Sequence, residues 1–112
     1  MSIGKYYDTT VDIERLSDVA GTDKETYAEV LSDILCKIEP QGSEYVMLAD
    51  GLFYKLFMMY CPPKDIRIGD RVIEDVSGDV YTVKGISLFK KGQAQDVVYP
   101  HHLEILLAIP QV

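Results

Sequence analysis

Histidine and cysteine are the side chains of this sequence that most readily act as bases, nucleophiles or metal ligands. There are two of each, Cys36, Cys61, His101 and His102. The histidines are sequence neighbours, and neighbouring side chains of a strand point to opposite faces, so they cannot bind one metal ion together or share acid–base work. A cysteine nucleophile needs a histidine and a third group that orients it, and no spacing here provides them. We therefore expect buried structural thiols and histidines at a surface or an interface.

A string of carboxylates is the other candidate for chemistry. It comprises Asp65, Asp70, Glu74, Asp75 and Asp79, interspersed with arginines and glycines. Solvated loop edges explain this composition best; a cation site is the alternative, although the regular acidic ladder of a calcium loop is missing. The chain also lacks a glycine-rich phosphate-binding loop and a Gly-x-Ser-x-Gly motif. We expect no catalytic residue, no metal and no cofactor, and therefore a protein that is not an enzyme.

The charge balance narrows the class of partner. The chain has 112 residues, 47% of them hydrophobic, and its 11 basic and 18 acidic residues give a net charge of −7. Residues 1–50 carry all of the excess, with 4 basic against 11 acidic groups, whereas residues 51–112 carry 7 of each. The length fits a single domain, and the spread of apolar residues excludes a disordered chain. An acidic protein is a poor general binder of nucleic acid, because such binding neutralises phosphates with Lys and Arg, so we expect a protein partner.

Membrane and secretory classes are not expected either. The longest apolar stretch, residues 52–61, contains Lys55 and is far shorter than a membrane-spanning helix. No basic segment followed by an apolar run marks a secretory signal, which predicts a cytoplasmic product with reduced thiols.

Most of the chain has the periodicity of strands. We expect strands over residues 11–16, 52–61, 71–76, 80–86 and 102–109. Pro62 and Pro63 should end the second of these, since proline donates no ladder hydrogen bond. Gly78 lies between the third and fourth, where a positive φ allows a tight hairpin turn. Short strands with this punctuation predict a small antiparallel β-barrel or a sandwich, with a long loop.

One segment supports two readings. Thr22 to Glu25 matches a helix capping box, and apolar residues follow at helical spacing, which predicts a short helix from Asp23 to Leu35. Residues 34–39, however, alternate as a strand does before Pro40. Local sequence leaves this choice open. We expect residues 44–50 to form a loop with one helical turn.

The strand over residues 52–61 carries more apolar side chains than one face of a strand can bury. Either it lies centrally and its whole set is core, or one face meets a neighbouring subunit, where aromatic and Met residues are enriched. The expected subunit interface consists of Phe53, Phe57, Met59 and Tyr60. The terminal segments 1–10 and 106–112 are further candidates for contact surfaces.

An ordered set of motifs resembles the head-tail joining proteins of tailed bacteriophages, also called head-completion or stopper proteins. It comprises Tyr27, Ile38-Glu39-Pro40, Gly42-Ser43-Glu44, the run from Ile66 to Val72 with Gly69, Asp70 and Arg71, the run from Gly78 to Ile86 with Tyr81 and Gly85, and Leu103-Glu104-Ile105-Leu106. Tyr27 stands where the family often has Trp. The resemblance covers roughly residues 10–108 and implies one β-barrel domain in which residues 34–39 form a strand.

The resemblance also implies a function. Such proteins assemble as a ring beneath the portal, contact portal or adaptor and tail-completion proteins, and join capsid to tail in the virion neck after assembly in the host cytoplasm. In some members a loop closes the DNA channel. The matching residues here are Gln41, Gly42, Ser43, Glu44, Tyr45, Asp50 and Gly51. Carboxylates repeated around a ring would let DNA pass without sticking. The alternative is a small β-barrel module of a host protein that binds a peptide or a small ligand.

Overall fold

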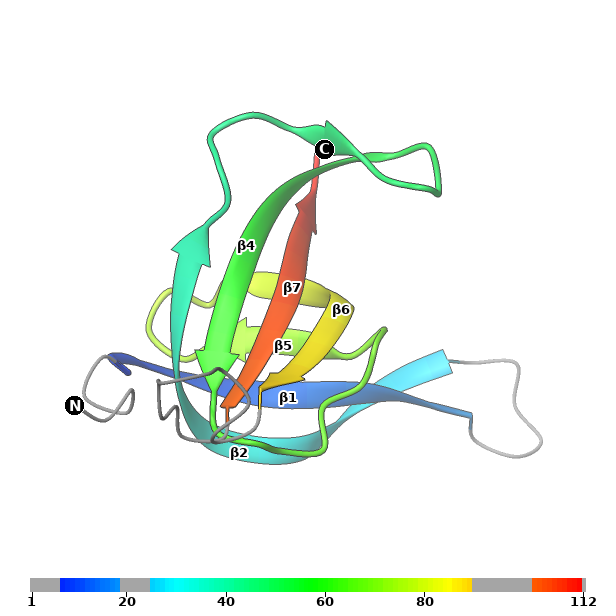
Figure 1. Cartoon of the computed structure of the whole chain (residues 1–112). Helices are drawn as coiled ribbons and strands as arrows, with labels where there is room; N and C mark the ends of the chain where they lie inside the picture. The colour runs from blue at the N-terminus through cyan, green and yellow to red at the C-terminus, as the bar shows by residue number, and fades with distance from the viewer. Residues whose placement is uncertain (1–6, 19–24, 90–101, 112) are drawn as a thin grey trace.

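Seven antiparallel strands make up most of the chain in the computed structural model, which describes residues 7–18, 25–89 and 102–111 (Figure 1). In chain order they are β1 (Thr9–Asp18), β2 (Glu25–Pro40), β3 (Val46–Met47), β4 (Phe53–Cys61), β5 (Arg71–Glu74), β6 (Val80–Phe89) and β7 (His102–Pro110). The expected mainly β fold is confirmed. No helix occurs in the described residues, and therefore none is long and apolar enough there to cross a membrane.

Six of the strands close into a barrel. Their order is β1, β5, β6, β7, β4 and β2, and the pairing of β2 with β1 completes the circle. The closing contact between β2 and β4 runs from Lys37 opposite Tyr60 to Pro40 opposite Phe57. Closure leaves only β3, which pairs with the start of β4, outside the barrel.

The interior is filled by apolar side chains from every barrel strand. The core residues are Val11, Ile13, Ile34, Cys36, Met59, Cys61, Ile66, Val72, Tyr81, Val83, Leu103, Ile105 and Leu107. Their spacing of two along most strands is the pattern that places one face toward the interior. The edge of the Phe57 ring meets the Tyr81 ring at 76° and a centroid distance of 5.1 Å, which is a favourable aromatic arrangement.

Strand β2 resolves the segment whose sequence supported both helix and strand. Residues 25–40 form one strand, so the helix predicted over 23–35 is wrong for its described part. Two irregularities in the β1–β2 pairing insert extra residues into β2, and Asp33 has φ +54° at one of them. Each bulge adds one residue to β2, which shifts the alternation of its side chains between the two faces by one residue. As a result, Leu31 and Ile34 both face the core although they are three residues apart. That spacing imitates one turn of a helix.

The predicted hairpin over residues 71–86 is confirmed as β5 and β6. Gly78 has φ +76°, and its N–H donates to the Glu74 carbonyl at 2.8 Å. The Ser77 hydroxyl accepts from the Asp79 N–H at 3.2 Å, which closes the turn locally.

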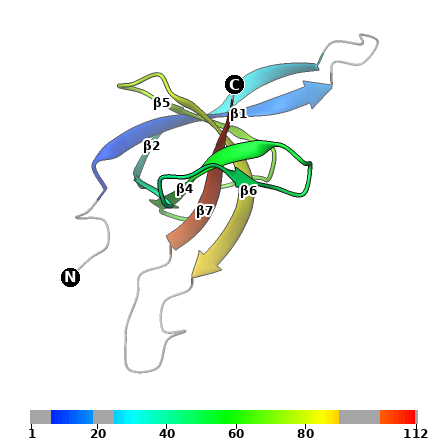
Figure 2. The same cartoon turned by 90° about the horizontal axis from the view of Figure 1, so that it is seen from above.

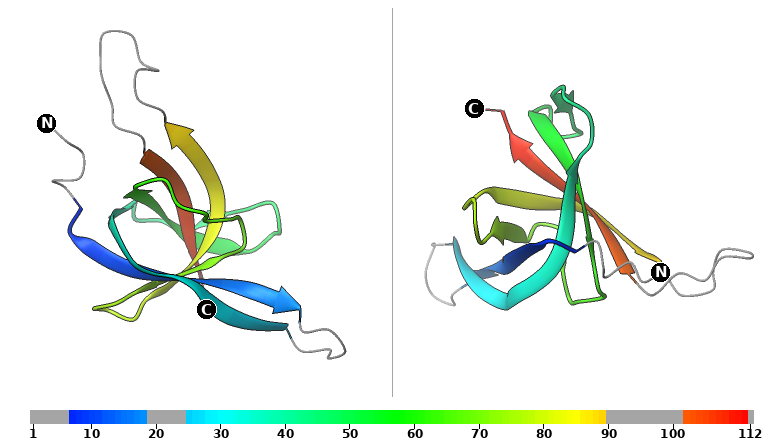
Figure 3. Two further views of the ribbon diagram at one scale, coloured as in Figure 1. Left: turned by 90° about the horizontal axis from the view of Figure 1, so that it is seen from below. Right: turned by 90° about the vertical axis from the view of Figure 1, so that its left-hand side faces the viewer.

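Strands β1 and β2 run beyond the barrel as a two-stranded arm. Residues 15–18 of β1 pair only with residues 25–28 of β2, whereas residues 11–14 also pair with β5. Viewed from above and from below, this arm extends away from the closed strands (Figures 2 and 3). A second projection, residues 41–53, lies at the top of Figure 1 and contains β3. We call it the apical hairpin.

Candidate interaction surfaces

The apical hairpin contains all residues of the expected channel loop, and several of its apolar side chains are exposed to solvent. The most exposed of them are Tyr45, Val46, Met47, Leu52 and Phe53. Gln41, Gly42, Ser43, Glu44, Asp50 and Gly51 are also exposed. The expected helical turn in residues 44–50 is replaced by β3 and a tight turn in which the Gly51 N–H donates to the Leu48 carbonyl at 2.9 Å.

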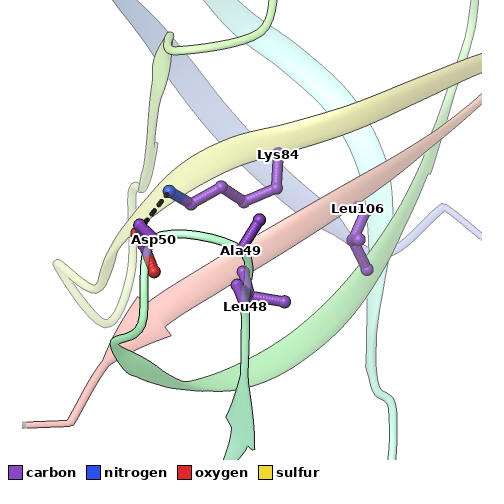
Figure 4. A pocket seen from close by; sticks show the side chains of 5 residues that line it. All are labelled: Leu48, Ala49, Asp50, Lys84 and Leu106. Atoms are coloured by element: carbon purple, nitrogen blue, oxygen red, sulfur yellow. Dashed lines mark ion pairs between the residues drawn. The ribbon is translucent and has the colours of Figure 1, made fainter.

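Asp50 fixes the hairpin to the barrel. Its carboxylate accepts hydrogen bonds from the Tyr54 hydroxyl and, at 2.9 Å, from the Leu52 N–H. Lys84 Nζ of β6 lies 3.9 Å from the same carboxylate (Figure 4). The hydrogen bond from Tyr54 lowers the pKa of Asp50 most, followed by the Leu52 N–H. Asp50 is therefore an ionised structural residue with a cation beside it.

A pocket of about 380 Å³ lies beneath this turn. It is lined by Leu48, Ala49, Asp50, Lys84 and Leu106, whose side chains come from the hairpin, β6 and β7 (Figure 4). Lys84 Nζ also lies 4.6 Å from the centre of the Tyr54 ring, a cation–π contact. The pocket can take an apolar group with a polar or anionic end at its rim.

A second pocket, of about 290 Å³, lies at the base of the arm. It is lined by Arg15, Leu16, Tyr27, Arg67, Ile68, Gly69 and Asp70. We call it the arginine pocket, because two of the three arginines in the chain line it and the third, Arg71, lies 3.5 Å above the Tyr27 ring. Their spacing in the sequence does not group Arg15 with Arg67 and Arg71. Only the pairing of β1 with β2 and β5 brings residues 15, 27 and 71 together.

Asp70 organises the floor of the arginine pocket. It is 2% exposed, and its two carboxylate oxygens accept from Arg15 Nε and from one terminal nitrogen of Arg15, both at 3.0 Å. It also accepts from the Arg67 N–H at 2.9 Å, a local backbone donor in the turn before β5. Its burial contradicts the prediction that the whole carboxylate string lies at solvated loop edges. A buried carboxylate needs such partners, and Arg15 supplies the charge.

The prediction of an interface on β4 is partly wrong, because alternate side chains of the strand face the core. Met59 is fully buried in the core, so it offers no surface to a neighbour, and Phe57 is half-buried with its side chain packed against the core. Phe53 is exposed at the start of the strand, and Tyr60 is half-buried. The outer face of β4 is instead formed by Leu56, Met58 and Tyr60, which are half-buried and outside the core.

No family model matches the chain, and no curated protein or solved structure matches it significantly.

Three carboxylates, from β1, β2 and the turn after β5, lie close together. Oxygens of Asp12, Asp33 and Asp75 all lie within 4.8 Å of one another, and the Asp33 N–H donates to Asp12 at 3.0 Å. Burial of the carboxyl and the negative charge of Asp12 raise the pKa of Asp75. Of the predicted string of acidic residues, only Asp75 belongs to this cluster. Carboxylates that share a site without a cation destabilise one another.

Histidine and cysteine take structural positions. Cys36 and Cys61 are free and buried, as predicted, and burial raises the pKa of each thiol to about 12. His102 is 5% exposed, so the prediction of a surface position for it is wrong. Its Nε2 lies 3.1 Å from a Glu104 carboxylate oxygen. His101 lies outside the described residues.

The remaining motif residues shape the barrel wall. Gly69 has φ +95°, and its N–H donates to the Val83 carbonyl at 2.9 Å, which joins the turn before β5 to β6. Tyr81 is buried, and burial raises its pKa to about 12. Gly85 lies at the register shift between β6 and β7. Their roles in the described structure are conformational and packing roles.

Proposed function

We propose that this protein is a structural connector of the tailed-phage type, which assembles as a ring beneath the portal and joins capsid to tail. The carrying observation is that one small barrel bears two exposed surfaces of different composition on different sides, the apical hairpin and the arm with its arginine pocket. Two different patches on each subunit are what a head-to-tail ring contact requires.

The apical hairpin is the segment that would close the DNA channel in such a ring. It projects from the barrel, and Asp50 holds the turn of residues 48–51 against Tyr54 and Lys84. Of its two carboxylates, only Glu44 has no ion pair among the described residues. Portal or adaptor proteins and tail-completion proteins are the partners of this proposal.

The test is assembly on a portal ring. Purified protein is mixed with purified portal rings of the phage or prophage whose genes neighbour its own, and the mixture is imaged by electron microscopy. We expect an added ring of density beneath the portal. A protein that leaves the portal rings unchanged at high concentration would overturn the proposal.

The pocket beneath the apical hairpin favours a second candidate, a small-barrel module that binds a peptide or a small apolar ligand. The probe is anilinonaphthalene sulfonate, whose anionic group suits Lys84 at the pocket rim. Saturable fluorescence that disappears in Ala49→Trp would support a binding module. Equal fluorescence in both proteins would argue against this pocket as a ligand site.

A further inference from the structure

The charges of the apical hairpin and of the arginine pocket are complementary. Residues 41–53 contain two charged residues, Glu44 and Asp50, and both are acidic. All three arginines of a chain with net charge −7 lie in or beside the arginine pocket. The arginines, three of the 11 basic residues, are therefore gathered on one surface, and the hairpin itself contains only acidic charged residues.

The arginine pocket retains capacity to bind a carboxylate. Arg15 is committed to Asp70 and to the Asp65 carbonyl, and Arg67 makes a two-bond contact with the exposed Asp65. The Arg67 side chain is nevertheless 63% exposed. Arg71 is exposed too, and its contact with the Tyr27 ring leaves its N–H groups available at the ring edge.

Apolar groups complete both surfaces. Ile68 is 68% exposed at the arginine pocket, beside the 41% exposed Leu16. On the hairpin, Tyr45 is 47% exposed and Met47 is 60% exposed, and they follow Glu44 by one and three residues respectively. Each surface thus offers an apolar patch next to a charge, and the two charges have opposite sign.

We propose that the apical hairpin of one copy of this chain docks in the arginine pocket of a second copy. Glu44 then pairs with Arg67 and Arg71 of the second copy, while Tyr45 and Met47 cover its Ile68 and Leu16. The proposal rests on the ring function proposed above and names the contact between its subunits. Because donor and acceptor surfaces differ and lie on different sides, the contact repeats from copy to copy and can close as a ring.

The contact gives Glu44 a pairing role. Hairpins docked on their neighbours would form a continuous collar, in which Glu44 faces arginine and Asp50 faces Lys84 of its own subunit. Closure of a channel by such a collar needs contact between subunits and does not need repulsion of DNA.

Cysteine cross-linking between two different variants tests the contact directly. Met47→Cys and Ile68→Cys proteins are mixed at high concentration and oxidised with diamide, which takes up the two hydrogens of the thiol pair. We expect at least a several-fold greater yield of disulfide-linked dimer in the mixture than in either protein alone. Cys36 and Cys61 do not interfere, because both are buried with pKa values raised to about 12.

Val76→Cys is the matched control for Ile68→Cys, because Val76 is 96% exposed at the turn between β5 and β6. Its mixture with Met47→Cys should give only the background yield. An equal yield from both mixtures would overturn the proposed contact.

Charge reversal adds a second test. Glu44→Arg in the Met47→Cys protein should abolish the enhanced yield, and Arg67→Glu in the Ile68→Cys protein should restore it. Enhanced yield that ignores both reversals would overturn the role of Glu44. The ring function is judged separately: portal rings that gain density while the mixed cross-link stays at background would reject this contact and keep the connector.

Discussion

Asp70 is the residue with the most concentrated set of polar contacts in the described chain. One buried carboxylate joins β1, through Arg15, to the turn before β5, through the Arg67 N–H. Replacing it with alanine leaves the Arg15 guanidinium and a backbone donor without their acceptor. We expect Asp70→Ala to lower the free energy of unfolding by about 2 kcal/mol in urea denaturation.

Asp65→Ala is the control for this prediction. Asp65 also contacts Arg15 and Arg67, but its side chain is 64% exposed, and water screens such pairs. The control should unfold near the urea concentration of the unchanged protein. Equal losses in both variants would show that burial of Asp70 is not what gives its contacts their strength.

Asp75 is the residue whose charge opposes the fold. Its pKa is raised above the usual 3.8 by burial and by Asp12, so folding favours its protonated form. Its contribution to stability is therefore present at low pH and is lost as pH rises through the raised pKa. We expect Asp75→Asn to melt at a higher temperature than the unchanged protein at pH 7, with the difference shrinking at pH 4. A difference that is absent at pH 7 would contradict the repulsion.

At the scale of elements, the hairpin of β5 and β6 and strand β4 were predictable because their signals are local. Gly78 marks the turn, and the Pro62–Pro63 pair ends β4. Strand β2 was predictable only over residues 34–39, which alternate as a strand does. Its earlier part was not, because the bulges put Leu31 and Ile34 at a helical spacing while its stability comes from pairing with β1. Tertiary pairing outweighed the local pattern. The arginine pocket was missed for the same reason, since its residues are distant in sequence.

Two adjacent methionines of strand β4 test which of its side chains face the core. Met59 is fully buried and Met58 is half-buried on the outer face. Met59→Ala should lower the free energy of unfolding by about 3 kcal/mol, because a cavity forms in the core. Met58→Ala should cost about 1 kcal/mol or less, because its side chain already contacts water. Chemical denaturation distinguishes this pattern from the reverse order, which an inward-facing Met58 would produce.

At the scale of the whole molecule, the uneven distribution of charge disfavours tight binding of DNA. The acidic excess lies in residues 1–50, which supply β1, β2 and most of the apical hairpin. Arg15 and Arg67 donate hydrogen bonds to Asp70 and Asp65, so the arginines do not form a row of free positive charges along which a phosphate backbone could bind. Few phosphates would be neutralised by such a surface, so the release of counterions from DNA would contribute little free energy to binding.

We therefore expect no complex with duplex DNA in a band-shift assay at ~50 mM salt, where phosphate contacts are strongest. Replacing Glu44 and Glu29 with lysine provides the positive control, because both are exposed and the two substitutions raise the net charge of the acidic half of the chain by four. A shift by the unchanged protein would mean that DNA binding, and not passage, is its contribution to a channel. Absence of a shift, together with added density on portal rings, is the combination that a connector wall requires, since DNA must slide past it without being held.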